Sequence, residues 1–182
     1  MPADQETKLI LPTRIHAADG AQMVLVNHVA GIGVVGPSHD TPQAHGPTKS
    51  PSGTGAFYID QMEVTVAKYK KINPKYDETP YTRKGGCPSC PAMGIDWSSA
   101  DGYCRSMGKR LPTEAEWETA ARGPAYYRLP WGNQFDPKRA NLVGNKDGFL
   151  SAAPVGSFPP GTSPYGAMDM IGNVWEWVGT PH

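Results

Sequence analysis

The chain has 182 residues, with 17 basic and 17 acidic side chains and a formal net charge of zero. With balanced charges, the chain has no overall positive field that would attract nucleic acid or an anionic membrane. No apolar run reaches transmembrane length. With 38% hydrophobic residues, 21 Gly and 19 Pro, the composition suits one loop-rich globular domain rather than a helical bundle. We therefore predict a soluble protein with neither nucleic acid nor membrane as a partner.

The first strand is expected soon after a polar start. Residues 1–20 are aperiodic and show no basic region followed by an apolar run, so we expect a flexible lead-in rather than a secretory signal, and the compartment stays open. Residues 23–26, Met-Val-Leu-Val, predict a buried strand. Residues 31–36 could form a second strand, and their glycine spacing does not indicate a phosphate loop, because no helix pattern follows.

Residues 37–55 are rich in Pro, Gly, Ser and His and predict a long surface loop. His39 and His45 in this loop lack the spacing of metal ligands, so we interpret both as solvated. After it, residues 56–60 predict a strand, and Thr65 is placed to cap a short helix through Ile72.

Cys87 and Cys90 form a C-x-x-C pair. A closed zinc site needs four ligands, and no second pair follows, so zinc is not expected. A disulfide, a redox pair or two free thiols remain open. Pro91 argues against a helix that would activate a thiol, so we favour a disulfide that staples the loop.

The next helix is predicted from Ser98, as N-cap, to a stop at Gly108. Its apolar stripe consists of Ala100, Tyr103, Cys104 and Met107. Cys104 in this stripe is expected to be a buried small hydrophobe or half of a disulfide rather than a nucleophile.

Residues 108–123 contain more signals of local secondary structure than any other stretch of the sequence. Thr113 and Glu116 form a capping box, which predicts a helix from Glu114 that Gly123 ends. We also expect a buried ion pair between Arg110 and Glu116.

Seven motifs occur in the order and spacing of the formylglycine-generating enzyme family, and the chain resembles its sulfatase-modifying factor domains over about residues 21–177. The motifs are Asp60 with Glu63-Val-Thr65, Trp97-Ser-Ser-Ala-Asp-Gly-Tyr-Cys104, Gly108-Lys-Arg-Leu-Pro-Thr-Glu-Ala-Glu-Trp-Glu118, Pro130-Trp-Gly-Asn133, Ala140-Asn141, Val155-Gly-Ser-Phe-Pro159 and Asp169-Met-Ile-Gly-Asn-Val-Trp-Glu-Trp177.

The resemblance implies an α+β fold with little regular structure and a C-type-lectin-like core, in one domain over residues 21–182. It also implies a chemistry: true formylglycine generators use molecular oxygen and copper(I) held by two cysteine thiolates, which are soft ligands suited to that ion. They oxidise a cysteine in a C-x-P-x-R segment of an unfolded sulfatase, which is the protein partner that the resemblance implies.

The resemblance further implies calcium at two oxygen-only sets of ligands, the donors that this hard cation prefers. The first set is Asn141, the carbonyl of Leu142, Asp147 and the carbonyl of Phe149, and the second is Asp169, the carbonyls of Gly172 and Val174, and Glu176. The alternative is that Asn141, Asp147 and Asp169 are turn residues that bond their own backbone. We expect the large side chains of Trp131, Trp175 and Trp177 to pack in the core.

The chain departs from the family at its end, since it stops at His182 before the segment that carries the copper-binding cysteines. No catalytic residue is therefore assigned, copper is expected for complete family enzymes and not here, and we expect a C-terminally truncated, inactive piece of an oxidoreductase. The alternative is a non-catalytic domain that binds protein or another ligand. The iron-dependent sulfoxide synthases of ergothioneine biosynthesis rank lowest, because they need a histidine cluster on a preceding helical domain.

Overall fold

The computed structural model describes residues 12–27, 55–82, 86–144, 147–149 and 151–179. The predictions for residues 31–36, His39 and His45 lie outside these residues.

A three-stranded antiparallel sheet forms the base of the domain, in the order β1 (Arg14–His16), β2 (Gln22–Val26) and β3 (Phe57–Asp60). The strands predicted over residues 23–26 and 56–60 are confirmed as β2 and β3. Strand β1 lies inside the expected lead-in, so ordered structure begins earlier than we expected. Its three residues contain one apolar side chain, and pairing with β2 rather than any local pattern makes them a strand.

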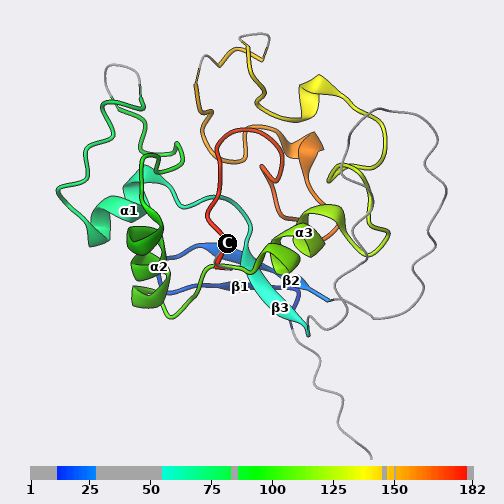
Figure 1. The fold of residues 1–182 in the computed structure, drawn as a ribbon, viewed down its shortest axis with the longest axis horizontal. Helices are drawn as coiled ribbons and strands as arrows, with labels where there is room; N and C mark the ends of the chain where they lie inside the picture. Colours follow the sequence, from blue (N-terminus) through cyan, green and yellow to red (C-terminus); the bar gives the residue numbers. More distant parts are fainter. Residues whose placement is uncertain (1–11, 28–54, 83–85, 145–146, 150, 180–182) are drawn as a thin grey trace, which may run out of the picture.

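Three α-helices follow the sheet: α1 (Val66–Ile72), α2 (Trp97–Ser106) and α3 (Glu114–Arg122). Two 3-10 turns, η1 (Pro137–Arg139) and η2 (Pro159–Gly161), interrupt the long loops. In Figure 1, α1 and α2 lie on one side of the molecule and α3 on the other, and the C-terminal segment descends between them towards the sheet.

The helix caps follow the sequence with one exception. Thr65 caps α1, and Thr113 and Glu116 form the complete capping box of α3. The N-cap of α2 is Asp96 rather than Ser98, since Asp96 Oδ1 accepts a hydrogen bond of 2.7 Å from the Ser99 amide. A carboxylate at this position also interacts favourably with the helix dipole.

Gly123 ends α3 with φ of 69°, as the sequence predicted. A β-carbon here would lie 2.5 Å from Cγ of Pro164, so close packing as well as backbone conformation requires glycine.

The core lies between the sheet and α3. Val24 and Val26 of β2 pack with Ala120 and Ala121 of α3 and with Met170.

The prediction that Trp175 and Trp177 pack in the core is wrong, because they are 103% and 50% exposed. They follow Asn173, which has φ of 57°. This left-handed residue turns the chain, and nothing in the local sequence shows which way the following side chains point. Trp131 is half-buried and donates a hydrogen bond of 3.0 Å to the Gln134 carbonyl.

Candidate functional site

The two loops that carry the predicted oxygen ligands pack directly against each other. The Asn173 amide donates to the Asn141 carbonyl at 2.9 Å, and Asn141 Nδ2 donates to Asn173 Oδ1 at 2.9 Å. Gly172 has φ of 77°, and a β-carbon there would lie 2.1 Å from the Asn141 carbonyl oxygen. The two predicted sets therefore belong to one structural unit.

Within the first set, Asp147 holds its neighbours through their main chain. Its Oδ2 accepts from the Leu142 amide at 3.1 Å and its Oδ1 from the Phe149 amide at 3.0 Å. Asn141 Nδ2 also donates to the Ser151 carbonyl at 2.9 Å. These bonds bring Asp147 together with Leu142 and Phe149. They are side-chain to main-chain bonds of the kind expected if Asp147 is a turn residue rather than a calcium ligand.

Within the second set, Asp169 is buried in a left-handed conformation, with φ of 58°. Its Oδ2 accepts from the Gly156 amide at 2.6 Å. Glu176 Oε2 accepts from Trp117 Nε1 at 3.0 Å, which ties this loop to α3. Each carboxylate is therefore oriented by one donor from outside its own loop.

Glu63 is a third carboxyl at this site, and sequence reasoning assigned it no role. Its Oε1 accepts from Asn173 Nδ2 at 2.9 Å, whereas its Oε2 is buried without a partner among the described residues. Burial, followed by the negative charges of Asp169 and Glu176, raises the pKa of Glu63 to about 9. The signals in the sequence were its place in the first family motif and at the corner between β3 and α1.

Glu176 is affected in the same direction. The residue as a whole is exposed, but loss of hydration at its carboxyl group raises its pKa to about 7, with Asp169 adding to the rise and the Trp117 hydrogen bond opposing it. We call Glu63, Asp169 and Glu176 the carboxyl cluster, because their negative charges act on one another and raise the pKa of Glu63 and of Glu176.

Side chains alone do not make a metal site here. Among the residues that the structure describes, no three His, Cys, Asp or Glu side chains form a group that could hold a metal ion. A cation at the second set would therefore depend on the carbonyls of Gly172 and Val174 as well as on carboxylates, as calcium sites commonly do.

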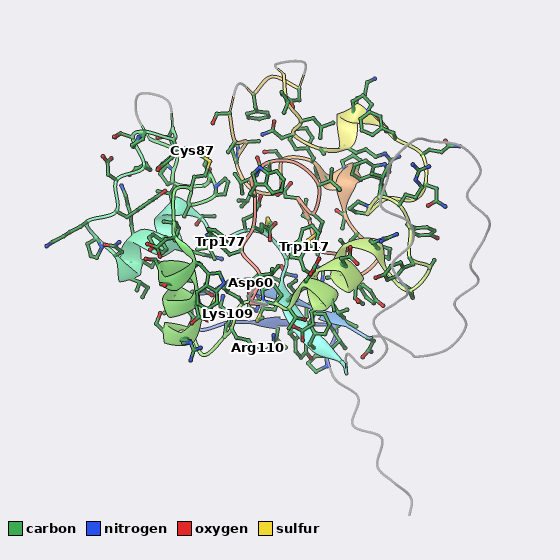
Figure 2. All side chains as sticks on the ribbon, in the orientation of Figure 1. Asp60, Cys87, Lys109, Arg110, Trp117 and Trp177 are labelled. Atoms are coloured by element: carbon green, nitrogen blue, oxygen red, sulfur yellow. A yellow bond between two sulfur atoms is a disulfide. The ribbon has the colours of Figure 1, made fainter. Side chains whose placement is uncertain are left out.

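A separate ion network lies at the junction of the sheet and α2. Lys109 Nζ contacts Asp60 Oδ2 at 2.7 Å and Asp19 Oδ2 at 3.0 Å, and Tyr103 donates to Asp19 Oδ2 at 2.8 Å. Burial raises the pKa of Asp60, although Lys109 opposes the rise. Figure 2 shows Asp60 and Lys109 close together below Trp177.

A cavity of about 460 Å³ is lined by residues of both this network and the carboxyl cluster. Its wall is mostly apolar and includes Met23 of β2 and Leu111, and both Asp60 and Glu63 line it. Trp175 and Trp177 also belong to its lining. The volume falls within the range of about 300–1,000 Å³ that is usual for ligand sites.

The predicted ion pair is present but only partly buried. Arg110 binds Glu116 through two hydrogen bonds, of 2.7 and 2.6 Å. The Glu116 side chain is 11% exposed, whereas that of Arg110 is 62% exposed. The carboxylate is thus buried and the guanidinium faces solvent.

The three cysteines offer no pair of free thiols. Cys87 and Cys90 form a disulfide, which confirms the loop staple that we favoured. Cys104 is free and half-buried in α2, and burial raises the pKa of its thiol to about 11. Cys104 is therefore protonated at neutral pH.

No helix within the described part of the chain is long and apolar enough to cross a membrane.

Known proteins share both the sequence pattern and the fold. A family model described as the sulfatase-modifying factor enzyme 1-like domain matches residues 12–182. The inactive C-alpha-formylglycine-generating enzyme 2 of Bos taurus is 46% identical over 101 residues, covering 50% of this chain and 33% of its own length. The formylglycine-generating enzyme of Bos taurus is 39% identical over 121 residues, or 60% and 32% of the two chains.

Among solved structures, PvdO from Pseudomonas aeruginosa matches with a TM-score of 0.63 and 28% identity, over 92% of this chain and 74% of its own. CarF, at 21% identity and a TM-score of 0.61 over 88% and 80% of the two chains, shares the fold. The chain spans about a third of the length of the curated relatives named above. With the family match over residues 12–182, the α+β chain belongs to the formylglycine-generating enzyme family of sulfatase-modifying factor domains.

Proposed function

We propose that these 182 residues form a calcium-binding domain of the family that binds polypeptide and does not itself oxidise cysteine. The state of the three cysteines carries this proposal. Copper(I) in the true generators needs two thiolates, whereas here two cysteines are joined to each other and the third is a protonated thiol in α2. The residues of this chain do not fit a copper site.

The relatives are compatible both with a domain that oxidises cysteine and with one that does not. One curated relative is named as an inactive formylglycine-generating enzyme and another as a formylglycine-generating enzyme. An unfolded sulfatase, or another polypeptide, is the partner class that we propose from the family resemblance. The C-type-lectin-like description of the core also stays a prediction, for which the small antiparallel sheet and the short helices give general support.

Calcium is supported by the charge balance of the second set. When ionised, Glu63, Asp169 and Glu176 repel one another, and the Glu63 oxygen without a partner among the described residues is buried. A divalent cation bound by Asp169 and Glu176 and by the carbonyls of Gly172 and Val174 would compensate this repulsion. The first set would hold its ion through Asn141, Asp147 and the carbonyls of Leu142 and Phe149.

Calcium titration of the metal-stripped chain tests this part. We expect heat release on binding and a rise in the thermal midpoint, because a ligand that binds only the folded state stabilises it. Asp169→Asn should weaken binding at least tenfold, whereas the exposed control Asp77→Asn should not change it. Equal affinity in the two variants would contradict the second site.

A peptide assay tests the absence of oxidation. The chain is mixed with a C-x-P-x-R peptide, copper(I) and oxygen, and aldehyde is measured by hydrazide labelling and mass spectrometry. We expect peptide binding without aldehyde. Aldehyde formation by the chain would overturn the proposal.

A further inference from the structure

The disulfide loop between Cys87 and Cys90 lies where three parts of the domain meet. Its carbonyls accept hydrogen bonds from the first amides of α1: Cys90 from Val66 and Pro88 from Ala67, both at 2.9 Å. These are helix amides that have no acceptor within the helix. The loop therefore caps α1 from outside.

The same loop holds the segment that leads to Asp169. The Val155 amide donates to the Ser89 carbonyl at 2.9 Å, and the next amide, of Gly156, donates to Asp169 Oδ2 at 2.6 Å. On the other side, the Ala92 amide donates to the Val64 carbonyl at 2.9 Å, next to Glu63. Two short main-chain paths thus connect the disulfide loop to the carboxyl cluster.

The two sulfur atoms differ in exposure. Cys90 is 5% exposed, whereas Cys87 is half-buried and lies on the α1 side of the molecule in Figure 2. An external thiolate can therefore attack Cys87, with Cys90 as the leaving thiolate. The second thiol of a dithiol then displaces Cys87, so that the dithiol becomes a disulfide and two electrons and two protons pass to the cysteine pair.

We propose that the Cys87–Cys90 disulfide is a redox-controlled clamp, opened by a dithiol, that holds the start of α1 and the Val155–Gly156 segment in place. The bond closes a loop of four residues, and short loops contribute less to global stability than long ones do. Reduction should therefore loosen the attached segments while the sheet and α3 stay folded. This inference does not depend on calcium binding.

Amide hydrogen exchange of the full chain, before and after treatment with dithiothreitol, tests the clamp. Alkylation under denaturing conditions confirms the redox state, with Cys104 alone labelled before reduction and all three cysteines after it. We expect protection of the Val66, Ala67 and Val155 amides to fall about tenfold on reduction, as local opening predicts, and to return on reoxidation. Protection of the Trp117 and Gly123 amides of α3 should not change.

Two variants control for side effects. Cys104→Ser should respond to dithiothreitol as the unaltered chain does. The double variant Cys87→Ser with Cys90→Ser should show low protection at the three amides with or without dithiothreitol. Unchanged protection after full reduction, or an equal loss of protection in α3, would overturn the clamp.

Discussion

At the residue scale, one amide side chain organises the candidate site. Asn173 binds Glu63 through Nδ2, and its Oδ1 accepts from Asn141 and from the Ala153 amide at 2.8 Å. Its left-handed backbone conformation is one that Asn tolerates better than most residues. At the preceding position, 172, only glycine fits, because the Asn141 carbonyl occupies the space that a β-carbon would need.

Gly172→Ala should therefore destabilise the domain by about 1–3 kcal/mol or more, from backbone strain together with the clash with Asn141. Gly102→Ala is a matched control in α2, where a new β-carbon meets nothing within 4 Å. That change should stabilise the chain by about 0.5–1 kcal/mol, because alanine favours helix. Urea unfolding measures both, and two changes of the same sign would contradict this account.

Glu116 gives a prediction about pH. The Arg110 hydrogen bonds, against the opposing effect of burial, lower its pKa from 4.5 to about 2. The ion pair therefore contributes its full stability above pH 4.5, and that contribution is lost as the pH falls towards 2. Glu116→Gln should be less stable at neutral pH and should lose less stability over this acid range. Parallel curves of thermal midpoint against pH would show that Glu116 has no such role.

At the scale of elements, the features that the sequence predicted are those decided within a few residues. The capping box at Thr113, the stop at Gly123 and the strand predicted over residues 23–26 all follow from local side chains and backbone preference. Strand β1 and the exposure of Trp175 depend on contacts with distant parts of the chain. For the same reason, the sequence could not show that Glu63 meets Asp169.

The cap of α3 can be tested by itself. Thr113→Ala removes the oxygen that accepts from the Glu116 amide and should cost about 1 kcal/mol in the free energy of unfolding. Thr113→Ser keeps this oxygen and should retain most of the stability. If serine and alanine destabilise the domain equally, lost packing of the methyl group rather than lost capping is the cause.

At the scale of the whole molecule, Lys109 joins three parts of the fold. Its ammonium group contacts Asp19 in the turn between β1 and β2 and Asp60 at the end of β3. Tyr103 of α2 donates a hydrogen bond to Asp19, so α2 is held at the same place. The side chains of Lys109, Asp19 and Asp60 are 9%, 4% and 20% exposed. Because the sheet makes few direct contacts with α2, this network fixes their relative position.

Lys109→Met should therefore destabilise the domain by about 3–5 kcal/mol, since it leaves two buried carboxylates without their cation. Without Lys109, the folded-state pKa of Asp60 should rise further above its ordinary value of 3.8, because burial already raises it and the opposing charge is gone. Protonation then relieves the penalty, so the variant should recover stability relative to the unaltered chain as the pH is lowered from 7 towards 5. Adding Asp60→Asn removes one of the two buried carboxylates that no longer have a cation, and should recover part of the lost stability at neutral pH. If the double variant is no more stable than Lys109→Met, the lysine acts through packing of its aliphatic stem rather than through its charge.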